Sequence, residues 1–175
     1  VLSLKKRNTQ IQPEFPKNEV ELLAYDVLII GDIKANELTS NQQQIIKSFV
    51  EEHGKSIVFL GGKNSLGRNG LGRSEMADLL PIVSPPIGCR FRDQDFSLRL
   101  TTQGKFHPIM QLGETSKLND DIWRDLPPLP RRIGGFQLRS GATTLAEFHQ
   151  SKSPEPIIVF QPHGLGKSLL IAAEG

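Results

Sequence analysis

Two apolar segments with an amphipathic segment between them constrain the fold of this chain more than any other feature. Residues 25–32 form a continuous apolar run that ends in Gly-Asp, which is typical of a parallel strand covered on both faces. Residues 42–53 place apolar side chains at helical spacing after the N-cap candidates 39–41, and Gly54 fits the C′ position that ends this helix. Residues 56–60 form a second buried strand before a Gly-Gly pair. The pattern predicts a right-handed βαβ unit and therefore an α/β protein.

The rest of the chain carries weaker signals for short elements. Residues 162–167 contain glycines and separate two apolar runs, so we expect a hairpin of 156–161 with 168–173. The other expectations are a strand at 1–4, loops at 5–18 and 63–73, a short helix at 75–80, a half-exposed strand at 96–101, an irregular segment at 113–130 and a strand at 143–148. We find no internal repeat and expect one domain, 1–175, with a β-rich portion added after Phe96.

Charge and composition exclude several classes of function. Lys and Arg total 21 against 19 for Asp and Glu, so charge predicts no nucleic-acid partner and no acidic membrane surface. The longest apolar runs, 27–30 and 57–60, are too short to span a bilayer, so we expect the chain itself not to cross a membrane. The single cysteine, Cys89, excludes an intrachain disulfide. The chain begins with Val1 instead of Met, and we expect it to be a fragment of a longer protein.

The glycine-rich loop after the second strand is the leading candidate for a binding site. Ligands of open α/β sheets bind at the carboxyl ends of strands, where backbone N–H groups and basic side chains can hold an anion. The candidate ligand-binding residues are Asp32, Gly61, Gly62, Lys63, Asn64, Arg68 and Arg73. The favoured alternative is a flexible loop whose glycines form turns and whose basic side chains are solvated, with Asp32 in an ordinary Gly-Asp turn.

Other chemistry-bearing residues give weaker signals. The Gly-Lys-Ser run at 166–168 ends like a phosphate-binding P-loop, but Gln161 stands where that motif needs glycine, and a strand follows instead of a helix. Arg90 and Arg92 would favour a thiolate at Cys89, yet the sequence places no histidine near it, so a structural thiol is favoured. The four histidines lack zinc-ligand spacing, and we expect no metal and no cofactor.

Several short motifs occur in a definite order along the chain. They are Tyr25-Asp26 in the first long strand, Gly61-Gly62, Leu80-Pro81, His107-Pro108-Ile109, Trp123 with Leu126-Pro127-Pro128-Leu129, Gly141-Ala142 with Leu145-Ala146, and a final hairpin with Gln161, Gly164, Gly166 and Lys167. This order resembles the class I glutamine amidotransferase-like fold, in the branch found in uncharacterised bacterial membrane proteins with von Willebrand factor A-like regions. The resemblance covers the whole chain and implies a three-layer, flavodoxin-like architecture. It also implies that a first strand and a helix lie upstream of Val1.

The same resemblance implies that glutamine hydrolysis is absent. A working amidotransferase carries its cysteine on the tight turn after the second strand, which falls at Gly61 here, and glycine has no side chain to form a thioester. His163 lies near the place of the family's catalytic histidine, but Leu165 replaces the glutamate that would orient it. With no nucleophile and no carboxylate for His163, we expect the fold without the activity.

Three functions stay open at this point. The favoured one is a non-catalytic amidotransferase-like module of a larger, membrane-anchored protein, which serves assembly or binds a protein partner or other domains of its parent chain. The second is a small-ligand or anion-binding domain at the strand ends. The third is a hydrolase whose nucleophile lies beside His107 or His163. Trp123 and the prolines after it would form a docking surface in the first case, although a tryptophan that pins a loop to the core is the simpler interpretation.

Overall fold

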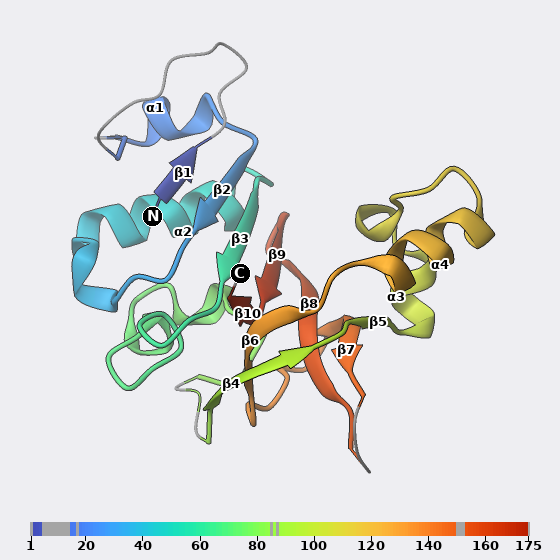
Figure 1. The fold of residues 1–175 in the computed structure, drawn as a ribbon. Coiled ribbons are helices and arrows are strands. Elements are labelled where there is room, and N and C mark those ends of the chain that lie inside the picture. Colours follow the sequence, from blue (N-terminus) through green and yellow to red (C-terminus); the bar gives the residue numbers. More distant parts are fainter. Residues whose placement is uncertain are drawn as a thin grey trace.

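The computed structural model describes residues 2–4, 15–16, 18–84, 86, 88–149 and 153–174. Within these residues the chain forms a seven-stranded mixed sheet and a three-stranded sheet, with helices packed against them (Figure 1). The strand order is β1-β2-β3-β9-β8-β7-β5 in the large sheet and β10-β6-β4 in the small one. The predicted α/β class is therefore confirmed.

The secondary-structure elements have the following bounds. The strands are β1 (Leu2–Leu4), β2 (Val27–Ile30), β3 (Ser56–Leu60), β4 (Arg90–Phe96), β5 (Arg99–Leu100), β6 (Leu129–Gly134), β7 (Thr143–Phe148), β8 (Glu155–His163), β9 (Gly166–Ile171) and β10 (Ala173–Glu174). The α-helices are α1 (Glu19–Leu23), α2 (Ser40–Glu51), α3 (Thr102–Phe106) and α4 (Ser116–Asp125), and the 3₁₀ helices are η1 (Ala35–Glu37), η2 (Leu71–Arg73), η3 (Ala77–Leu79) and η4 (Pro108–Met110). Ala172 alone separates β9 from β10, so the chain passes directly from the large sheet into the small one.

The predicted βαβ unit is present as β2, α2 and β3. β2 and β3 pair in parallel, with Val27 opposite Ser56. Thr39 caps α2, because its Oγ1 accepts from the Gln42 N–H while Gln42 Oε1 accepts from the Thr39 N–H at 2.8 Å. After the helix, Gly54 has a φ of 67° and turns the chain toward β3.

The strands after Phe96 mostly extend the large sheet instead of adding a separate portion. β9 pairs with β3 in parallel, and the predicted hairpin of β8 with β9 is confirmed, with Gly164 and Leu165 forming its turn. β7 and β5 continue the sheet in antiparallel pairing, while β4, β6 and β10 form the small sheet. The portion after Phe96 is thus rich in strands, as expected, but β9 lies inside the large sheet and carries buried side chains on both faces, as a central strand of a covered sheet does.

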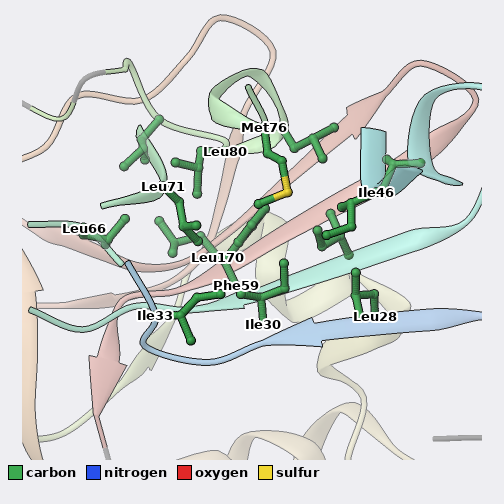
Figure 2. Packing of buried hydrophobic residues seen from close by; sticks show 14 of the residues in the cluster. Leu28, Ile30, Ile33, Ile46, Phe59, Leu66, Leu71, Met76, Leu80 and Leu170 are labelled. Atoms are coloured by element: carbon green, nitrogen blue, oxygen red, sulfur yellow. The ribbon is translucent and has the colours of Figure 1, made fainter. Parts of the chain in front are cut away.

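The first hydrophobic core lies between the large sheet and α2 (Figure 2). Leu28, Ile30, Phe59 and Leu170 point from the strands toward Ile46 of α2. The side chains of Leu66, Leu71, Met76 and Leu80, from the segment after β3, close the same cluster. This packing fixes the loop that follows β3 against the sheet.

A second core packs against the opposite face, on the β8 and β9 side. Phe96 and Phe148 meet edge to face, with ring centroids 5.7 Å apart. Trp123 borders this core and donates from Nε1 to the backbone oxygen of Met110 at 2.8 Å. The pinning role expected for Trp123 is thus present, but the residue lies on α4 and not on a long loop.

Three of the expected elements differ from the structure. The segment 113–130, expected to be irregular, contains α4, which Thr115 caps by accepting from the Leu118 N–H at 3.2 Å. The strand expected at 96–101 is broken, because β4 ends at Phe96 and Thr101 already caps α3. The helix expected at 75–80 is reduced to the single 3₁₀ turn η3. In the first two cases a threonine N-cap, Thr115 or Thr101, marks where a helix begins.

In the described part of the chain, no helix combines the length and apolarity that a bilayer span requires.

Candidate functional site

Asp32 organises the loop at the carboxyl end of β3. Its Oδ1 accepts from the backbone N–H groups of Asn64 at 2.9 Å and Ser65 at 2.6 Å, and its Oδ2 accepts from Asn64 Nδ2 at 3.0 Å. A Cβ on Gly62 would lie 2.2 Å from Asp32 Cγ, so only glycine permits this approach. Asp32 therefore has a larger role than an ordinary turn: it holds a loop 32 residues further along the chain.

The loop itself is packed, which corrects the expectation of a flexible segment, although the basic side chains Lys63, Arg68 and Arg73 are exposed as expected. Leu66 and Leu71 are buried, and Ser65 Oγ accepts from the Gly62 N–H at 2.9 Å. The N–H groups of Gly62, Asn64 and Ser65 are thus already occupied by partners inside the protein. These groups are not free to cradle an anion, as the glycine-rich sequence had suggested.

Gly61 occupies a tightly packed position directly after β3. Its N–H donates to the Ile171 oxygen at 2.8 Å, and a Cβ there would lie 3.0 Å from Leu66 Cδ1. Gly61 borders an open cavity that is also lined by Asp32 and Glu174. The lining contains two carboxylates but neither a thiol nor an imidazole among the described residues. The cysteine chemistry of an amidotransferase needs a thiol and an imidazole in contact, and this lining offers no such pair.

His163 and Gly61 lie at opposite ends of β9. Gly61 follows Leu60, which pairs with Ile171, whereas His163 pairs with Gly166 at the other end of β9. At ~3.3 Å per strand residue the two positions are about 17 Å apart. The resemblance had placed His163 near a catalytic position, and the register of β9 overturns that placement.

The expectation that His163 lacks a carboxylate partner is also wrong. Its Nε2 lies 2.9 Å from Glu51 Oε1, at the end of α2. The neighbouring Leu165 N–H donates to the Glu51 oxygen at 2.9 Å, and a Cβ on Gly164 would lie 2.6 Å from the Glu51 Cα. The glycines of the hairpin turn therefore allow close packing on α2, and the Glu51–His163 pair joins the hairpin to that helix.

The other nucleophile and base candidates are separated as well. His107 Nδ1 accepts from the Ile109 N–H at 3.3 Å, and its ring packs 4.6 Å from that of Phe160. Burial raises the pKa of the Cys89 thiol, which disfavours the thiolate that the sequence had linked to Arg90 and Arg92. Within the described part of the chain, neither His107 nor His163 is hydrogen-bonded to a serine or to Cys89.

Among the candidate residues, Lys63 lies near basic residues that the sequence did not connect with it. It lines a cavity of about 100 Å³ together with Arg92, Arg131 and Arg132. Arg68 and Arg73 are exposed and do not line it. The Arg-Arg pair at 131–132 and the Arg-x-Arg pair at 90–92 were visible in the sequence, but only the pairing of β4 with β6 shows that they are adjacent.

Comparisons with known proteins place the fold but no family. No protein-family model matches the chain, and no curated protein matches it. Among solved structures, the cytoplasmic protein STM3548 from Salmonella typhimurium is similar, with a TM-score of 0.69 and 18% identity over 93% of this chain. The cytoplasmic protein STM1381 from Salmonella typhimurium LT2 gives a TM-score of 0.65 and 20% identity over 91% of this chain. The chain spans 65% of the length of each.

The same fold also occurs inside larger enzymes. A β-galactosidase from Rahnella sp. R3 matches 87% of this chain with a TM-score of 0.57 and 15% identity, but the match covers only 21% of the enzyme. At these identities the likeness concerns the fold alone. The class that fold and site define is thus an α/β domain with a mixed sheet, also found in uncharacterised bacterial proteins.

Proposed function

We propose that this chain is a non-catalytic module of the class I glutamine amidotransferase-like type, three-layered and flavodoxin-like in its parallel half. It belongs to a larger, membrane-anchored protein and serves assembly or the binding of a protein partner. The observation that carries the proposal is the separation of Gly61 from His163 by the length of β9. An amidotransferase needs its nucleophile and base in contact, and the histidine that the resemblance pointed to, His163, lies at the opposite end of β9 from Gly61.

The comparisons support a modular role. In the matching β-galactosidase this fold accounts for about a fifth of the chain, so the fold can occur as one domain of a longer polypeptide. The two Salmonella proteins are also longer than the matched region. The membrane-anchored parent rests on the motif resemblance to the branch with von Willebrand factor A-like regions.

An apolar groove on the large sheet offers the contact surface for such a partner. It is lined mainly by Val27, Val58, Ile109, Phe160 and Leu169, and it lies at the amino ends of β2 and β3. Val27 is 38% exposed although it stands in a strand whose alternate residues are fully buried. Contiguous exposed apolar surface of this kind is typical of interaction sites. We assign it to another domain of the parent protein.

Glutamine hydrolysis provides the test of the non-catalytic part. We expect purified protein to release no ammonia from glutamine above the rate of heat-denatured protein. The variant Gly61→Cys should also stay inactive, because no histidine of the described residues lines the cavity at Gly61 and His163 lies at the other end of β9. Ammonia release by either protein at a rate that requires folded protein would overturn the proposal.

A matched pair of valine substitutions tests the partner-binding part. Val27 lies in the groove, whereas Val20 is 79% exposed on α1, away from it. With a photo-crosslinking residue at each position in the full parent protein, we expect a defined crosslink from position 27 to another domain and none from position 20. The purified domain should then bind this chain, lose binding with Val27→Asp and keep it with Val20→Asp. Equal behaviour of the two positions would exclude the groove as the contact surface.

A further inference from the structure

The face of the large sheet that points away from α2 is only partly covered over β2 and β3. Four side chains of these strands point toward α2 and are at most 1% exposed: Leu28, Ile30, Ile57 and Phe59. Their neighbours in sequence point the opposite way, and of these Val27 and Leu60 are each 38% exposed. β2, β3 and β9 pair in parallel, and a parallel sheet is normally covered on both faces. Within the described part of the chain, this face therefore has less cover than such a sheet usually has.

The side chains on this face form rows across the three parallel strands. Ile29 of β2 lies opposite Val58 of β3, and Val58 lies opposite Leu169 of β9. In the next row toward the carboxyl ends, Leu60 lies opposite Ile171. Residues paired in register point to the same face of a sheet, so the rows form one apolar surface.

Two cavities open on this surface, one at each end of β3. The groove described above has a volume of about 360 Å³ and lies at the amino end, beside η4. A second cavity of about 580 Å³ lies at the carboxyl end, beside Leu129 and Ala173. Val58 lines the first cavity and Leu60 lines the second, and both residues point to the same face of β3. One elongated partner can therefore fill both cavities.

The charges at the two ends of the surface differ in sign. At the amino end, Lys167 lines the groove, is exposed and forms no ion pair with another described residue. At the carboxyl end, the carboxylate of Asp32 lines the second cavity. At each end a neighbouring ion pair adds no net charge: Asp26 with Lys55, and Glu174 with Arg131. The surface is thus positive where the strands begin and negative where they end.

We propose that an amphipathic α-helix of the partner domain lies along β3 on this surface and runs antiparallel to the strand. The inference rests on the proposed function, since this helix is the part of the partner that fills the groove. Helices are the elements that cover the faces of parallel sheets, and an apolar stripe on the helix packs on Val58 and Leu60. A helix is positive at its N-terminus and negative at its C-terminus. In the antiparallel direction these ends meet Asp32 and Lys167, respectively.

Photo-crosslinking from both ends of the surface in the full parent protein tests the helix. Val27 pairs with Ser56, so crosslinkers at positions 27 and 60 stand about 13 Å apart along the strands, at ~3.3 Å per residue. A helix rises ~1.5 Å per residue and spans this distance with about nine residues, whereas an extended segment needs about four. We expect the residue reached from position 60 to precede the one reached from position 27 by about nine positions. Leu118, 47% exposed on α4 and outside both cavities, is the control position and should reach neither residue.

The possible results separate the helix from the contact itself. Crosslinks from position 27 alone, a separation of about four residues, or the reverse order would overturn the helix but leave the contact surface in place. The absence of crosslinks from both positions would overturn the proposed contact surface as well.

A charge reversal tests the direction of the helix. Lys167→Glu places a negative charge beside the helix C-terminus and should weaken binding of the purified partner domain about threefold at low salt, and less at high salt. Lys167 is exposed, so this variant should fold normally. Lys117→Glu, at an exposed position on α4, is the control and should leave binding unchanged. Unchanged or tighter binding of Lys167→Glu would overturn the antiparallel direction.

Discussion

The carboxylate of Asp32 lies against the Cα of Gly62, so closely that a Cβ on Gly62 would stand 2.2 Å from Asp32 Cγ. The contact ties the turn after β2 to the loop after β3. Three hydrogen bonds from Asn64 and Ser65 keep the carboxylate in place. Because the carboxylate cannot move without losing them, the contact links the carboxyl ends of β2 and β3.

Replacing Gly62 by alanine should destabilise the protein. The methyl group would displace the Asp32 carboxylate and break its hydrogen bonds, at a cost of about 1–3 kcal/mol. Urea denaturation measures the free energy of unfolding. In an Asp32→Ala background, where no carboxylate is left to clash, the same glycine substitution should cost clearly less. Additive effects of the two substitutions would contradict this relationship.

Loss of the α2 cap should lower the stability of the protein by less than the Gly62→Ala substitution does. Thr39→Ala removes the hydroxyl that accepts from the Gln42 N–H, and we expect a loss of about 1 kcal/mol in the free energy of unfolding. Ser40→Ala, at the next and equally exposed position, is the control and should change stability little. Thermal or urea unfolding of the two variants gives the comparison. A larger loss for Ser40→Ala would mean that the cap lies elsewhere.

One buried and one exposed phenylalanine test whether burial sets the loss of stability on substitution by alanine. Phe59 is 1% exposed in the first core, whereas Phe106 is 79% exposed at the end of α3. We expect Phe59→Ala to cost about 3–5 kcal/mol, because it leaves a cavity, and Phe106→Ala to cost less than about 0.5 kcal/mol. Denaturant unfolding measures both. Similar losses would argue against the packing in Figure 2.

Cys89 should react slowly with thiol reagents in the folded protein. Burial raises its pKa, so at pH 8 a smaller fraction is thiolate than in an exposed cysteine, and the rate should keep rising above that pH. The rate of reaction with a disulfide reagent, followed between pH 7 and pH 10, checks this. Denaturation in urea should restore ordinary reactivity. A fast reaction at neutral pH in folded protein would indicate an activated thiol instead.

The sequence predicted elements well where local and long-range preferences agree. β2, α2 and β3 follow from a long apolar run, a capped amphipathic segment and a second apolar run. α4 was missed, because its residues are mostly polar and a proline-rich segment follows it. In that helix, the buried Asn119 and the packing of the partly buried Trp123 against the second core show which face points inward.

The candidate site was predicted only in part. Proximity of Asp32 to the loop 61–73 follows from the parallel pairing of neighbouring strands, which the sequence supports. The use made of that proximity does not, since the sequence cannot show that Asp32 and Ser65 already satisfy the loop's N–H groups. The Glu51–His163 pair was also invisible, because it joins residues 112 positions apart.

The amino-acid sequence by itself determined the α/β class, the βαβ unit and the glycine at position 61, because these depend on local patterns of apolar residues and on residue identity. Only the tertiary structure decided at which end of the strands each candidate side chain lies. The direction and register of β9 carry His163 away from Gly61, and the pairing of β4 with β6 brings Arg92 beside Arg132. Strand pairing joins residues far apart in the chain, and no local pattern specifies such partners.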